Sequence, residues 1–190
     1  MVRIAILGLI SVAMATTVTM EKAQNSAHNV VVDADDSVQR YYGIPLDLTL
    51  KQLAKLPFKS KVTLEHGDED LSSPVAIISA RRGVKIRAEF DDDGKLYRFE
   101  TSTPGAMGLR GLRIGSTLAE LQRAFPQRKP YWGATPHDQY YATFGTGTPL
   151  TFHFSPFDVP KETWASGPER FQLPPSIKVK KITITPINWR

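Results

Sequence analysis

The residues of this chain best suited to acid–base or metal chemistry are its four histidines, His28, His66, His137 and His153. His66 is followed closely by the acidic residues 68–70, and His137 adjoins Asp138. A carboxylate beside an imidazole can share a metal ion with it or tune it as a general base. No two histidines have the H-x-x-x-H spacing that places two ligands on one helix face. Polar loops are therefore the simpler interpretation, and a periplasmic hydrolase or metal-dependent enzyme using His66 or His137 is the alternative.

Other reaction motifs are missing. The acidic run 91–93 ends at Gly94 and lacks the later ligands and distal Glu of a calcium loop, so we predict a hairpin turn with Gly94 at positive φ. The sequence contains no Gly-x-Ser-x-Gly nucleophile elbow and no phosphate-binding loop. It also contains no cysteine, which excludes disulfides and thiolate ligands. We predict no catalytic residue, no cofactor and no metal.

The aromatic residues are the stronger functional candidates, and the six we assign to partner binding are Tyr131, Trp132, Tyr140, Tyr141, Phe157 and Trp164. Exposed Trp and Tyr side chains anchor protein interfaces because they offer a large contact area at a small entropic cost. For Trp132, packing in the core is an equal alternative. Trp164 lies in a proline-rich stretch, and we expect it to be exposed because loops run over the surface.

The element expected to position the aromatic residues is a capped helix within Gly111–Pro126. Thr117 and Glu120 have the spacing of a capping box, in which each side chain bonds the other's backbone amide. Leu118, Leu121 and Phe125 follow at helical spacing, and Pro126 ends the helix.

A similar stretch, Gly43–Pro57, lies upstream, with Thr49 and Gln52 spaced for a second capping box. We therefore predict an α+β fold of two tandem copies, residues 41–105 and 106–190. Each copy has one helix followed by an antiparallel sheet of three to four strands, and we leave open whether the two sheets join.

The strands expected in the two copies follow from alternating or short apolar runs. They cover residues 61–64, 75–79, 84–90 and 96–101 in the first copy, and 140–144, 150–154 and a return strand from Lys178 in the second. Leu96 and Phe99 break the two-residue period, which suggests a bulge. An inserted loop at 155–176 carries five prolines and three large aromatic residues, and a loop of this length in a compact domain is often functional.

The segment Gly-Leu-Arg-Ile-Gly-Ser-Thr-Leu-Ala-Glu-Leu at Gly111–Leu121, with the Asp92–Lys95 hairpin, resembles two kinds of small periplasmic module. One is the SmpA/BamE outer-membrane assembly lipoprotein and the other is the tandem-repeat β-lactamase inhibitory protein. The resemblance implies that the chain binds another protein and performs no catalysis. The chain lacks the lipidated cysteine of the first and the disulfides of the second.

The N-terminus has the features of an export signal. Arg3 precedes the apolar run Ile4–Val12, and Ala13 and Ala15 form a small-x-small cleavage site, so residues 1–15 are the predicted signal peptide. A cleavage site as late as residue 24 is the alternative. The apolar run is shorter than the ~20 residues of a transmembrane helix. Residues 16–40 are predicted to be a flexible lead-in, with an edge strand at Val30–Val32 as the alternative.

The formal net charge of +5 is modest, and basic and acidic residues are interspersed, so we predict no nucleic-acid binding. The prediction for the whole chain is an exported, periplasmic or secreted, soluble binding module. Its partner is another protein or a cell-envelope polymer, and its role is of the inhibitor, immunity or envelope-assembly type.

Overall fold

The computed structural model describes residues 30–32, 38–66, 72–134, 140–165 and 171–186. The predicted signal peptide at 1–15 lies outside these residues, as do His28 and His137. Within the described ranges, no helix is both long and apolar enough to span a bilayer.

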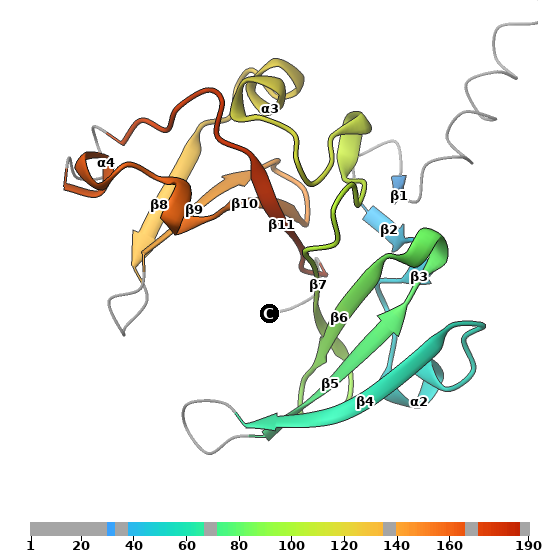
Figure 1. Cartoon of the computed structure of the whole chain (residues 1–190). Helices are drawn as coiled ribbons and strands as arrows, with labels where there is room; N and C mark the ends of the chain where they lie inside the picture. The colour runs from blue at the N-terminus through green and yellow to red at the C-terminus, as the bar shows by residue number, and fades with distance from the viewer. Residues whose placement is uncertain (1–29, 33–37, 67–71, 135–139, 166–170, 187–190) are drawn as a thin grey trace, which may run out of the picture.

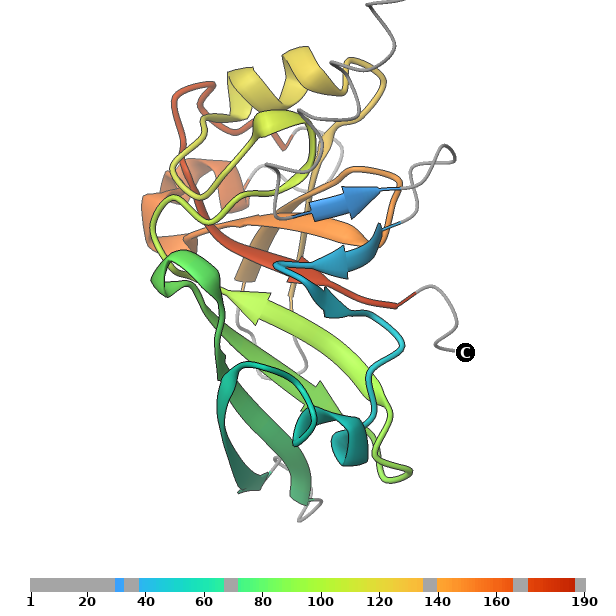
Figure 2. The same ribbon diagram turned by 90° about the vertical axis from the view of Figure 1, so that its right-hand side faces the viewer.

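Eight antiparallel strands form one sheet in the order β4-β5-β6-β7-β11-β10-β9-β8 (Figure 1). In chain order these strands are β4 (Lys59–His66), β5 (Ser72–Ser79), β6 (Lys85–Phe90), β7 (Leu96–Thr101), β8 (Pro130–Ala134), β9 (Tyr140–Gly145), β10 (Leu150–Phe154) and β11 (Val179–Ile184). A small second sheet holds β1 (Val30–Val32), β2 (Val38–Tyr41) and β3 (Ile44–Pro45), and so places strands inside the stretch expected to be a flexible lead-in. Figure 2 shows this small sheet, in blue, at a height between α3 and α2.

The described helices are short. They are α2 (Leu50–Leu53), α3 (Leu118–Ala124) and α4 (Lys161–Ala165), with three 3-10 turns, η1 (Arg81–Gly83), η2 (Leu109–Gly111) and η3 (Pro156–Asp158). The helix within the stretch Gly43–Pro57 ends at Leu53. After it the amides of Lys55 and Leu56 make the tighter i−3 hydrogen bonds, and Pro57 cannot continue a helix.

The predicted fold class, two helix-plus-sheet copies, is wrong. Strand β7 pairs with β11, with Thr101 opposite Ile182 and Phe99 opposite Ile184, so the strands of both halves belong to one antiparallel sheet. This pairing satisfies backbone groups that two separate sheets would leave as unpaired edges. With only four residues in α2, the described part of the first half also has no helix long enough to cover a sheet of its own.

Both predicted capping boxes are confirmed. At α3 the amide of Thr117 donates to Glu120 Oε2 at 2.7 Å, and the amide of Glu120 donates to Thr117 Oγ1 at 3.3 Å. Thr49 and Gln52 make the same reciprocal pair at α2. Arg110 closes the other end of α3, where its Nη1 donates to the carbonyl of Ala124 at 2.6 Å.

The predicted hairpin and bulge are also confirmed. Gly94 has φ +72° and its amide donates to the carbonyl of Asp91. The register between β6 and β7 skips at Tyr97, because Glu89 faces Arg98 and the next residue faces Leu96. An equivalent skip occurs at Lys180 in β11. A bulge of this kind lets one strand carry an extra residue while both flanking segments stay paired.

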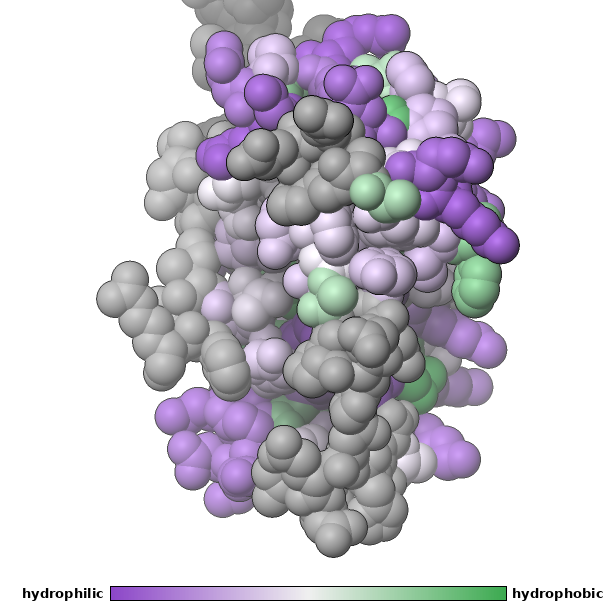
Figure 3. Space-filling model, turned by 90° about the vertical axis from the view of Figure 1, so that its left-hand side faces the viewer, coloured by the Kyte–Doolittle hydropathy of each residue, from purple (hydrophilic) through white to green (hydrophobic). Residues whose placement is uncertain are grey.

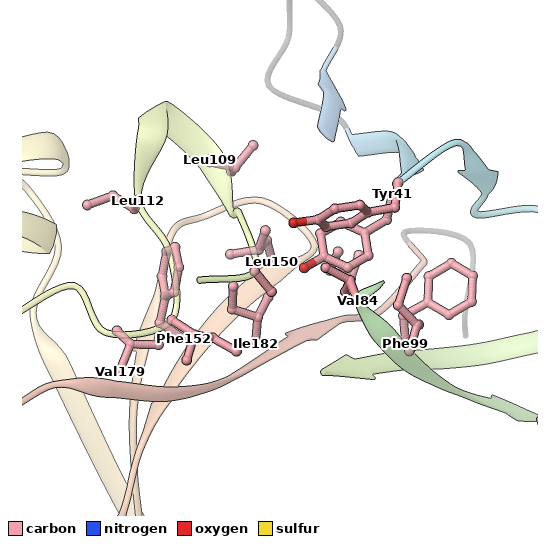
Figure 4. Close-up of a cluster of buried hydrophobic side chains, with 14 of the residues drawn as sticks. Tyr41, Val84, Phe99, Leu109, Leu112, Leu150, Phe152, Val179 and Ile182 are labelled. Carbon is pink, nitrogen blue, oxygen red and sulfur yellow. The ribbon is translucent and has the colours of Figure 1, made fainter. Parts of the chain in front are cut away.

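The hydrophobic core lies against one face of the large sheet and includes residues from both halves of the chain (Figure 4). Phe99 and Phe152, on β7 and β10, are almost completely buried in it. Tyr42 joins the core to the small sheet, because its hydroxyl accepts a hydrogen bond from the amide of Met107 at 2.8 Å. The opposite face of the large sheet carries polar side chains, as the alternation on β10 shows: Leu150 and Phe152 are buried, whereas Thr151 and His153 are only half-buried.

Candidate binding surface at the end of the sheet

Four of the six predicted partner-binding residues lie on the last two strands of the sheet. Strand β8 is the outermost strand and pairs with β9, with Tyr131 opposite Thr143, Trp132 opposite Ala142 and Gly133 opposite Tyr141. Because side chains alternate along a strand, Tyr131 and Trp132 point to opposite faces. Ala142 is completely buried, so Trp132 lies on the core face and the two tyrosines of the 131–141 pair lie on the polar face.

On the core face, Trp132 belongs to a cluster of aromatic rings. Its centroid lies 5.8 Å from Tyr140, 6.0 Å from Trp164 and 6.0 Å from Phe171. Tyr140 stacks on Trp164 at 5.2 Å with an interplanar angle of 22°. The inserted loop thus contributes two rings, one from α4 and one at Phe171, to the end of the sheet. The site prediction omitted Phe171, although the aromatic content of the insertion was a signal for it.

Trp164 is half-buried in this cluster instead of standing free on a surface loop, and Trp132 is half-buried as well. Both rings pack against their neighbours, so their contribution is to hold the insertion on the β8–β9 hairpin. Trp132 Nε1 is buried and has no hydrogen-bond acceptor in the part of the chain that the structure describes. The cluster is therefore held together by ring packing and not by a hydrogen bond from this indole nitrogen.

On the polar face, Tyr131 and Tyr141 form an exposed pair. Their ring centroids are 6.2 Å apart, and 59% of Tyr131 and 36% of Tyr141 is accessible. A methyl group at Gly133 would collide with the Tyr141 ring, so this glycine leaves the space in which the ring lies across β8. A hydrogen bond with the Tyr131 side chain raises the pKa of Tyr141 above its ordinary value.

Phe157 stands apart from both groups. It lies on η3, is 96% exposed, and has no ring contact among the described residues. The turn is fixed by the Ser155 hydroxyl, which accepts from the Phe157 amide at 3.2 Å, and by an ion pair of Asp158 with Lys180 at 3.3 Å. Phe157 is thus a second exposed apolar point, borne by the insertion itself.

The side of the molecule that bears β8 and α4 is shown in Figure 3. Pale, weakly polar residues gather at its mid-height, between strongly hydrophilic groups above and below.

His153 is the one of the four histidines whose side chain the structure describes. It faces Thr143 on β9 and Lys181 on β11. Burial, the Lys181 charge and the Arg98 charge together lower its pKa to about 4, so its imidazole is neutral at pH 7. Its Nε2 atom is buried and has no hydrogen-bond partner in the described part of the chain.

The alternative enzymatic residues are largely outside the described structure. His66 is the last residue of β4, and His137, Asp138 and the acidic residues 68–70 fall in undescribed ranges. Among the residues that the structure does describe, no group of three or more His, Asp or Glu side chains is placed to hold a metal ion.

Comparison with known proteins identifies no family for this chain. No model of a known protein family matches its sequence, and no curated protein matches it. In its fold the chain is similar to the crystal structure of the uncharacterized protein yfeY from Escherichia coli, with a TM-score of 0.48 and 14% sequence identity. The match covers 74% of this chain and 90% of that chain.

Proposed function

We propose that this chain is an exported protein-binding module that holds its partner at the β8–β9 end of the large sheet. The observation that supports this most is the Tyr131–Tyr141 pair, two large rings on the outermost hairpin with substantial exposed area. Aromatic residues of this kind are frequent interface hot spots. The roles we assign to the protein remain inhibition, immunity or envelope assembly.

The packing of the opposite face of the β8–β9 hairpin against the insertion also favours binding at the exposed pair. The hairpin that carries Tyr131 and Tyr141 also carries Trp132 and Tyr140, whose rings pack against the insertion on the opposite face. A side chain on a braced strand loses less freedom when a partner docks, because its backbone is already ordered. The exposed pair is therefore pre-organised for contact, which a tyrosine on an unsupported loop would not be.

Affinity capture with matched variants tests the proposal. The bait is the chain from residue 16 onward, the sample is an envelope extract of the source cell, and the double variant Tyr131→Ser with Tyr141→Ser is compared with the unchanged chain. We expect one protein to be enriched by the unchanged chain and lost with the double variant. Phe157→Ser removes a still more exposed ring elsewhere and serves as the control.

Three outcomes would contradict the proposal. Equal capture by the unchanged chain and the folded double variant would remove the tyrosine pair from the binding surface. Loss of capture with Phe157→Ser alone would transfer the surface to the insertion. Retention of a polysaccharide in place of a protein would favour the envelope-polymer alternative. Thermal unfolding of each variant establishes that the fold is intact.

A further inference from the structure

The polar face of the sheet carries a cluster of charged residues on β6, β7 and β11, on the same face as the tyrosine pair but separated from it by β10. The cluster comprises Arg87 and Glu89 on β6, Arg98 and Glu100 on β7, and Lys181 on β11. His153 on β10 lies opposite Lys181, and the charge of Arg98 also contributes to lowering its pKa. Thr143 connects the cluster to the proposed binding end, since it faces His153 on one side and Tyr131 on the other.

Among the described residues, Lys181 and Arg98 have more donors than the two carboxylates of the cluster occupy. Glu89 pairs with Arg87 and, through Oε2, with Arg98 Nη2 at 2.6 Å. Glu100 pairs with Lys181 Nζ at 3.2 Å. An ammonium group has three donors, so two remain on Lys181 in the part of the chain that the structure describes. The Nε donor of Arg98 is buried and has no acceptor among the described residues, so it is not itself open to a ligand, which would meet the exposed part of the guanidinium.

The charge count of the cluster indicates the charge of a ligand. Three cations face two carboxylates, so the net charge is +1 with His153 neutral. A group with a single negative charge would neutralise this set, whereas a phosphate dianion would overcompensate it. A carboxylate has this charge, and its two oxygens match paired N–H donors.

The side chains of the two cations are accessible to a ligand, although residues near them on the same face are buried. The side chains of Lys181 and Arg98 are 37% and 36% exposed. Beside them Thr143 and Thr183 are buried to 9% and 8% exposure, although both lie on the face opposite the core. Ionic hydrogen bonds are stronger in such a setting than on an open surface because less water competes for the donors.

We propose that Lys181 and Arg98 form a binding site for a carboxylate group on the polar face of the sheet. Two sources present this chemistry: an acidic side chain or chain terminus of a protein partner, and a small organic acid. In the first case the carboxylate is bound on the same face as the Tyr131–Tyr141 pair, across β10 from it, as part of one extended interface, a form that rests on the proposed function. The site itself does not require a partner protein, so its test is separate.

Sodium acetate is the first probe, in a nuclear magnetic resonance titration of the ¹⁵N-labelled chain at pH 7. Sodium chloride at equal ionic strength controls for screening. We expect saturable shifts in the amides of residues 98–100, 151–153 and 181–183 with acetate only. A hexaglutamate peptide is the second probe. Peptide binding at least tenfold tighter than acetate assigns the site to a partner protein, and equal affinity per carboxylate assigns it to a small acid.

Neighbouring lysines provide matched variants for the titration. Lys181→Gln is expected to weaken acetate binding at least fivefold, and Lys181→Arg to retain it within about twofold, since the charge is kept. Lys180→Gln makes the same charge change at the next position, where the side chain pairs with Asp158, and should leave binding unchanged. Equal weakening by the two glutamine variants, or the absence of saturable shifts with both probes, would overturn the proposal. Neither result bears on the tyrosine variants.

Discussion

The indole of Trp164 meets that of Trp132 edge to face, with their ring centroids 6.0 Å apart. This contact joins the insertion to the outermost strand of the sheet. It places the bulk of both tryptophans on the core face, where Tyr140 stays 46% exposed, and Tyr131 and Tyr141 are exposed on the other face. Binding as proposed requires that Trp132 and Trp164 hold the β8–β9 hairpin in place while Tyr131 and Tyr141 contact the partner.

Replacing Trp164 by Ala should destabilise the protein by about 2 kcal/mol, less than the full cost of a completely buried ring, because Trp164 is half-buried. It should also loosen the insertion, since its contacts with Tyr140 and Phe171 are lost with the ring. Urea unfolding measures the first effect. The control is Phe157→Ala, which we expect within about 0.5 kcal/mol of the unchanged chain; a larger loss for Phe157→Ala than for Trp164→Ala would refute the bracing role.

The Tyr131–Tyr141 pair makes a prediction about titration. A hydrogen bond with the Tyr131 side chain is the main cause that raises the pKa of Tyr141, so Tyr131→Phe should return that pKa toward its ordinary value. Carbon-13 chemical shifts of the labelled tyrosine rings, followed through alkaline pH, report each ring separately. If Tyr141 titrates at the same pH in both proteins, the two hydroxyls are not bonded in solution.

Because His153 is buried and neutral, we expect the folded protein to lose stability in acid. Burial, followed by the Lys181 and Arg98 charges, lowers its pKa in the folded chain to about 4, while the unfolded value is near 6.5. Below pH 6.5 the unfolded chain therefore binds more protons at this residue, and stability falls as pH falls toward 4. The loss from His153 alone should reach about 2 kcal/mol near pH 4.5.

Carboxylates also titrate in this range, so the His153 effect is isolated by comparison with His153→Gln. The measurement is the free energy of unfolding of both proteins at pH 7.5 and pH 4.5. The unchanged chain should lose more stability than the variant over this interval. An equal loss in the two proteins would mean that His153 is not held neutral between its cationic neighbours.

We expect the loss of the α3 N-cap to destabilise the protein. Thr117→Ala removes the hydroxyl that accepts from the Glu120 amide and should cost about 1 kcal/mol, measured by thermal unfolding. Thr117→Ser keeps the acceptor and should cost much less. Similar losses for the two substitutions would show that the hydroxyl does not cap the helix.

Local features of this fold could be predicted from the sequence because their causes lie within a few residues. The two capping boxes, the hairpin at Gly94 and the bulge at Tyr97 each follow from neighbouring residue types. The pairing of β7 with β11 could not be predicted in this way, because it joins segments about eighty residues apart and depends on which sheet edges remain open.

The arrangement of the candidate site could not be predicted from the sequence for the same reason, because it depends on long-range pairing. Strand β8 is only five residues long and begins with Pro130, so no clear two-residue pattern identified it. Without that strand the sequence could not assign Tyr131 and Trp132 to opposite faces. The packing of Trp164 on Trp132 is likewise a long-range contact that no local pattern encodes.

Hydrogen–deuterium exchange of the complex with the captured partner tests the central claim most directly. We predict new protection of the amides in residues 131–134 and 140–145, because these strands carry the tyrosine pair and lie under the docked surface. Protection confined to the other end of the sheet, in β4 and β5, with unchanged exchange in β8 and β9, would contradict it.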